Sequence, residues 1–111
     1  MNAAEIKRLV HDAIGDSWDV TNHHGVDLRR ALVLPRSIKV IQRLVQAGKV
    51  QDEVIDAWLV LIEKPESDGG YRIVVDAEGR TFGLASEGFA KDEHLVLCGW
   101  YGDFWHAFAG M

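Results

Sequence analysis

The run from Val54 to Ile62 places the tightest constraint on how this chain can fold. Almost every residue in it is apolar, and Asp56 is its one charged residue. A strand with one face in water alternates apolar and polar residues, whereas a strand buried on both faces does not. The run therefore predicts a strand that is covered on both sides, either by helices on each face or by a partner chain. A homodimer would provide such a partner chain.

Further strands are predicted from alternation and β-branched content, with turn formers between them. They cover residues 26–34, 71–75, 81–85 and 94–99. Pro35 is expected to end the first of these strands, because proline cannot donate to a central ladder. Gly79 is expected to close a tight hairpin between the second and third, since glycine readily takes a positive φ.

Residues 36–47 fit two structures. Their apolar residues suit a helix that stops at Gly48, while their β-branched content suits a strand that turns at Ala47 and Gly48. The strand is preferred, and the helix remains open.

A helix is predicted at each end of the chain. Asn2 and Glu5 have the spacing of a capping box, and apolar residues recur every three or four positions through residues 3–14 before Gly15. The aromatics that begin at Tyr101 are spaced as on one face of a short final helix. The predicted fold class is α+β, an antiparallel meander sheet of four to six strands with an N-terminal helix and a short C-terminal helix. Residues 1–111 are expected to form a single globular domain.

Cysteine usage and hydropathy indicate a cytoplasmic protein. Cys98 is the only cysteine, so no disulfide can form within the chain, and it is expected to be a small core residue of a buried strand. The N-terminus lacks the basic and apolar regions of a signal peptide, and no apolar stretch reaches the length of a membrane span. No contact with a membrane is expected.

The charge of the chain is unevenly distributed. Residues 1–49 hold eight Lys/Arg and five Asp/Glu, whereas residues 50–111 hold four and twelve, and the net charge is −5. A net negative charge argues against general binding to nucleic acid. The basic residues cluster in a stretch without acidic residues from Leu28 to Gln51. This stretch is interpreted as a solvated face neutralised by the acidic second half, and the alternative is a basic stripe for an acidic partner.

Motifs for catalysis and metal binding are missing from the sequence. Four scattered histidines, His23, His24, His94 and His106, lack the spacing of zinc ligands. The acidic pairs at positions 52–53 and 92–93 are interpreted as solvated turns. We therefore assign no catalytic, cofactor-binding or metal-binding residue and expect a binding domain rather than an enzyme. The alternative is a ligand-binding or catalytic domain with a pocket between the C-terminal helix and the sheet.

The aromatic C-terminus is the most concentrated feature of the chain. Five aromatics cannot all face inward on so short a helix, and exposed Trp and Tyr often dominate protein interfaces. Together with the acidic loops they form the predicted protein-binding surface. Its residues are Trp100, Tyr101, Asp103, Trp105, Glu87, Asp92 and Glu93.

Four segments carry a family resemblance. They are Asp56–Leu61, Gly70–Val74, Phe82–Ser86 and Gly99–Phe104. Together they resemble a group of short bacterial proteins of unassigned function, and the chain is similar in general character to the immunity proteins that neutralise polymorphic toxins. The resemblance implies a small cytoplasmic protein-binding domain, and more narrowly a toxin-neutralising one.

Overall fold

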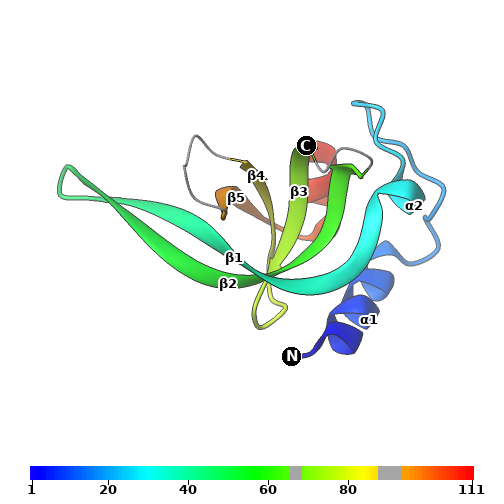
Figure 1. The fold of residues 1–111 in the computed structure, drawn as a ribbon. Coiled ribbons are helices and arrows are strands. Elements are labelled where there is room, and N and C mark those ends of the chain that lie inside the picture. Colours follow the sequence, from blue (N-terminus) through cyan, green and yellow to red (C-terminus); the bar gives the residue numbers. More distant parts are fainter. Residues whose placement is uncertain (66–68, 88–93) are drawn as a thin grey trace.

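Five strands form a closed barrel in the computed structural model, which describes residues 1–65, 69–87 and 94–111. The strands are β1 (Leu32–Gln46), β2 (Lys49–Lys64), β3 (Gly69–Asp76), β4 (Phe82–Glu87) and β5 (Leu95–Gly102). Successive strands pair antiparallel in chain order, so β1 and β5 run in the same direction. They close the barrel through a short parallel pairing at Val40–Leu95 and Ile41–Val96. The predicted meander is therefore correct in its order, but the prediction of an open sheet is wrong (Figure 1).

Helices form where the sequence places them at the two ends. α1 (Ala3–Ile14) begins with the predicted capping box, in which the Asn2 side chain accepts from Glu5 N at 2.9 Å and the Glu5 carboxylate accepts from Asn2 N at 3.0 Å. It ends at Gly15, whose φ is 64°. α3 (Phe104–Gly110) is shorter and needs its packing against the sheet to be stable.

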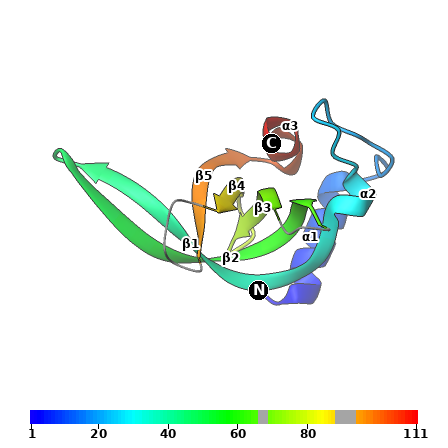
Figure 2. The same cartoon turned by 45° about the horizontal axis from the view of Figure 1, so that its top comes forward.

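Two apolar clusters fill the molecule, one on each face of the sheet. The inner cluster consists of strand side chains alone. Leu95, Leu97 and Trp100 of β5 pack against members from the other four strands, so the cluster occupies the inside of the barrel. Its buried members are Val40, Ala57, Leu59, Ile62, Val74 and Ala85. The outer cluster joins the outside of the sheet to the helices. Its members include Ile6, Val10, Ile14, Val60, Leu61, Ile73, Phe104 and Phe108. Figure 2 shows α1 and α3 beside the strands.

β2 contributes to both clusters, as its continuous apolar run predicts. Leu59 and Ile62 belong to the inner cluster, whereas Val60 and Leu61 belong to the outer one. The ladder with β3 shifts register between Leu59 and Leu61, and such a bulge increases the local bend of a strand. The second face of β2 is thus covered by the closed barrel itself. Neither a second helical layer nor a partner chain is required for this.

The segment before and after Pro35 differs from the prediction in two ways. Residues 26–34 are not one strand, because Asp27 caps the four-residue helix α2 (Leu28–Ala31) by accepting from Arg29 N at 3.1 Å. Pro35 does not end a strand either. It lies within β1 where the register with β2 shifts between Leu32 and Arg36, so no regular ladder bond is lost there.

Residues 36–47 are a strand, and β1 turns into β2 at Ala47 and Gly48. Both residues have positive φ, 51° and 76°, which is the two-residue geometry that suits the twist of a hairpin. At the C-terminus, Tyr101 is in β5 and not in the final helix. Gly102, with φ 87°, turns the chain, and α3 begins only after Asp103.

Candidate protein-binding surface

The predicted binding residues that the structure describes do not form one surface. Trp100 is half-buried against the inner cluster, whereas Trp105 is half-buried against the outer cluster and donates from Nε1 to the Ala13 carbonyl at 3.1 Å. Tyr101 is 41% exposed. Phe104 and Phe108 of α3 are buried, so the aromatic helix contributes mainly to the core.

The acidic residues of the predicted surface have separate local roles. Asp103 is the N-cap of α3, where its Oδ1 accepts from His106 N at 2.8 Å and lies 3.0 Å from His106 Nδ1. The Glu87 carboxylate lies 3.3 Å from Nη2 of Arg72, a side chain that is 4% exposed at the end of the inner cluster. Asp92 and Glu93 lie outside the described residues. Tyr101 and Asp103 are thus the part of the predicted surface that is both exposed and adjacent in the chain.

The basic stretch is partnered across the β1–β2 hairpin. Lys39 Nζ lies 2.6 Å from the Asp56 carboxylate, and Arg43 Nε lies 3.2 Å from that of Asp52. Both carboxylates belong to the acidic second half, so these pairs agree with the interpretation of a neutralised face. Positions 52 and 53 are strand residues of β2, and their prediction as a turn is wrong.

Cys98 is exposed, so its prediction as a core residue is wrong. The β4–β5 ladder shifts register between Leu84 and Ala85, pairing them with Gly99 and Leu97 and leaving Cys98 between these pairs. Its Sγ lies 3.4 Å from Ser86 Oγ on the outer face of the barrel. Within the described part of the chain, no three His, Cys, Asp or Glu side chains are grouped as a metal site would need.

The described residues line two hollows, and neither lies between α3 and the sheet. One, of about 220 Å³, is lined mainly by residues 25–31 and 63–65. The other is an apolar crevice of about 40 Å³ between α1 and the first residues of β1. Where the sequence suggested a pocket, against α3, the side chains of Phe104, Ala107, Phe108 and Met111 are buried. The described residues therefore give the pocket alternative no support at that position.

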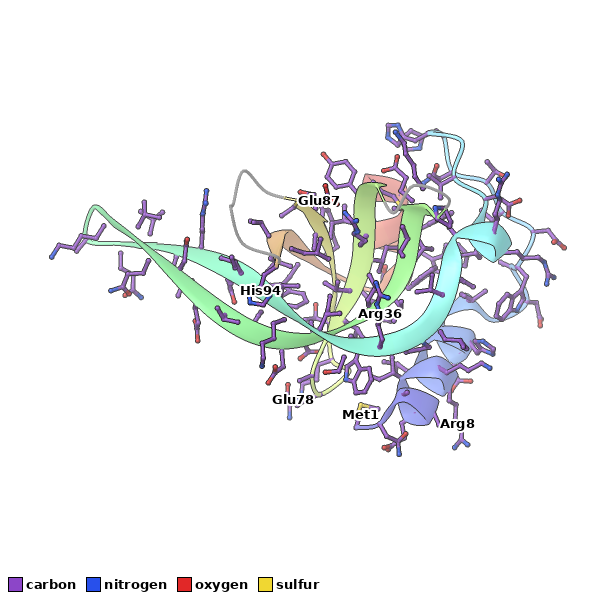
Figure 3. All side chains as sticks on the ribbon, in the orientation of Figure 1. Met1, Arg8, Arg36, Glu78, Glu87 and His94 are labelled. Atoms are coloured by element: carbon purple, nitrogen blue, oxygen red, sulfur yellow. The ribbon has the colours of Figure 1, made fainter. Side chains whose placement is uncertain are left out.

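The most distinctive surface is the far end of the β1–β2 hairpin, which projects from the barrel (Figure 1). Among the described residues, Gln42–Gln46 pairs only with Lys49–Glu53, and Val54–Asp56 pairs only with Lys39–Ile41. We call Gln42–Gln46 and Lys49–Asp56, with the turn between them, the distal hairpin. Figure 3 shows its side chains standing out from the ribbon on both sides, away from the helices.

One face of the distal hairpin alternates aliphatic and charged pairs. Val45 lies opposite Val50, Arg43 opposite Asp52, and Ile41 opposite Val54. The valines at positions 45, 50 and 54 are 73%, 65% and 53% exposed. The Ala47–Gly48 turn sets this register, so the pairing could have been predicted from the sequence. The sequence does not indicate that, among the described residues, no neighbouring strand covers this hairpin.

None of the helices in the described ranges has the length and apolar character needed to cross a membrane. Comparison of the chain with protein-family models, with curated proteins and with solved structures finds no match.

Proposed function

We propose that this chain is a small cytoplasmic protein-binding domain, and more narrowly a toxin-neutralising protein of the immunity type. We further propose that it contacts its partner through the distal hairpin. The observation that carries the proposal is the exposure of Val45, Val50 and Val54 on one face of that hairpin. Exposed apolar patches of this kind mark interaction sites or aggregation hazards.

The energy available from this face is substantial. Burying a valine side chain completely stabilises a complex by about 1.5–3 kcal/mol. With these three valines 73%, 65% and 53% exposed, burying them is worth roughly 3–6 kcal/mol before the entropic cost of association, against the ~8 kcal/mol net of a micromolar complex. The remainder would come from polar contacts and from the barrel surface next to the hairpin.

The hairpin is also held in shape before binding. The Arg43–Asp52 pair links its two strands, the Lys39–Asp56 pair joins its base to β1, and the tight turn fixes the register. A preorganised surface loses less conformational entropy on binding, so more of the contact energy appears as affinity.

A double substitution tests the proposal. Val45→Lys with Val50→Glu removes the apolar pair and leaves an attractive cross-strand pair in its place, so the hairpin keeps its register. The matched control is Leu34→Gln, which alters an aliphatic side chain that is 76% exposed at the other end of β1. The tagged chain is recovered from the source cell, and the proteins bound to it are quantified by mass spectrometry.

We expect the wild type and Leu34→Gln to retain the same partner and the double variant to lose it. Circular dichroism should show equal folding of all three. Recovery of the wild-type chain without any other protein would refute the protein-binding role. Full retention of the partner by the folded double variant would refute the role of the hairpin.

A further inference from the structure

The outer edge of β2 is open along its first half. β2 pairs with β3 from Ala57 to Lys64, but Lys49–Asp56 has only β1 beside it among the described residues. In an antiparallel ladder, alternate residues direct their N–H and C=O groups away from the strand already paired. This half-strand therefore presents a row of backbone donors and acceptors that can accept another strand.

Acidic side chains follow this open edge. Asp52 forms an ion pair with Arg43 of β1, and Asp56 forms one with Lys39 of β1. A carboxylate has two oxygens and can accept several hydrogen bonds, so each can bind a second cation on the outer side. Glu53, on the other face, lies opposite the neutral Gln42. A strand added beside β2 would meet a row of carboxylates along its length.

The same face of β2 also alternates in polarity. Side chains on one face recur every second residue, which gives the order Val50, Asp52, Val54, Asp56. A strand added beside β2 complements this order when its side chains on the same face of the sheet alternate between aliphatic and basic. Its aliphatic residues then meet the valines and its basic residues meet the aspartates. The basic residues of the added strand then lie on one side of the β2 carboxylates, and Lys39 and Arg43 of β1 lie on the other side.

From these features, and resting on the proposed function, we infer the occupant of this edge. It is an extended segment of the partner protein, with lysine or arginine alternating with aliphatic residues on one face, which pairs as a strand beside Lys49–Asp56. Backbone hydrogen bonds supply a general part of the affinity, and the alternation of charge and apolar surface supplies the selectivity.

A second copy of this chain fits the edge poorly. When two copies pair antiparallel through this edge, residues on the same face lie opposite each other, so the two central registers set Asp52 against Asp52 or Glu53 against Glu53. Like charges directly opposite each other destabilise a ladder. The charge pattern of the edge thus favours a basic partner over self-association.

A synthetic peptide tests the inference on the full chain. In this peptide, lysine and valine alternate on one face and threonine occupies the other. It is titrated into the ¹⁵N-labelled protein, and amide shifts and amide exchange are followed by NMR. We expect saturable shifts and slowed exchange confined to the distal hairpin. A peptide with glutamate in place of lysine, and one with alternate backbone nitrogens methylated, should each bind at least tenfold more weakly.

Matched neutralising variants localise the effect. Asp52→Asn should weaken the lysine peptide about threefold to fivefold, as expected for loss of one exposed charge pair. Glu78→Gln, on the β3–β4 turn, should leave its affinity unchanged (Figure 3). Sedimentation of the protein without peptide should show a monomer.

Equal binding of the lysine and glutamate peptides, shifts elsewhere on the barrel, or no binding at millimolar peptide would overturn the inference. A dimer that Asp52→Asn strengthens would also overturn it, because the edge would then accept a second copy. These results leave the proposed function standing if the cellular partner still depends on Val45 and Val50. Recovery of the wild-type chain without any cellular partner would refute the proposed function itself.

Discussion

Pairing of β4 with β5 depends on a close approach at Gly83. A Cβ atom added there would lie 2.7 Å from the Gly99 carbonyl oxygen and 2.7 Å from Cε3 of Trp100. Carbon atoms pack best at about 3.5–4.0 Å, so Gly83→Ala forces overlap with a backbone atom and with a ring that fills the barrel. Overpacking of this kind costs about 1–3 kcal/mol.

Gly99→Ala is the matched control in the neighbouring strand. Its added Cβ would meet only Tyr101 Cε2, at 3.8 Å, which is an ordinary contact. Neither glycine has a positive φ, so backbone strain is not involved. Replacing glycine in an accessible conformation typically stabilises by about 0.4–1 kcal/mol through the unfolded chain. We therefore expect Gly99→Ala to be neutral or slightly stabilising.

Urea unfolding followed by tryptophan fluorescence measures both variants. Gly83→Ala should lower the free energy of unfolding by about 1–3 kcal/mol, and its Tm by roughly 4–8 °C for each kcal/mol. Equal stabilities of the two variants would refute the packing of Trp100 across Gly83, and with it the tight β4–β5 contact.

Three other substitutions test the remaining parts of the fold. Ala47→Asn should strengthen the distal hairpin by about 0.5–1 kcal/mol, because asparagine tolerates a positive φ better than alanine; slower amide exchange in the hairpin is the readout, and unchanged or faster exchange would contradict it. Phe104→Ala should cost about 3–5 kcal/mol in urea unfolding, since the ring is fully buried against three other aromatics; a cost below 1 kcal/mol would show that α3 is not part of the core. A double-mutant cycle on Lys39 and Asp56 should give a coupling of roughly 0.2–1 kcal/mol that falls with added salt, because both side chains are more than half exposed; a larger coupling that salt does not change would refute a solvated pair.

Features set by local chemistry were predictable from the sequence. The Asn2–Glu5 capping box and the Ala47–Gly48 turn involve neighbours in the chain, so propensity and spacing suffice to place them. The run from Val54 to Ile62 correctly indicated a strand covered on both faces from Ala57 to Ile62, but Val54 and Asp56 at its start are exposed in the distal hairpin. It could not indicate that the second cover is the barrel interior, because closure depends on two residue pairs between β1 and β5, far apart in sequence.

Register shifts accompany two of the errors, those at Pro35 and Cys98. Side chains in a strand alternate between faces, so a bulge of one residue reverses which ones are buried. A bulge in β1 accommodates Pro35, and the shift in the β4–β5 ladder accompanies the exposure of Cys98. Nothing in the local sequence marks these positions.

The sequence did not indicate the distal hairpin as a candidate site. Aromatic residues at the C-terminus suggested a surface, but Phe104 and Phe108 find cover in the outer cluster formed with α1. The projecting valines are ordinary strand residues by composition. Their significance depends on the absence of a neighbouring strand among the described residues, which only the tertiary arrangement shows.

The role of the distal hairpin is tested most directly by hydrogen–deuterium exchange of the chain in complex with the protein it captures. We expect slower exchange of the Lys49–Asp56 amides in the complex than in the free chain, with the amides of the β3–β4 turn unchanged. Unaltered exchange in Lys49–Asp56, with protection instead around Tyr101 and Asp103, would contradict binding through the hairpin.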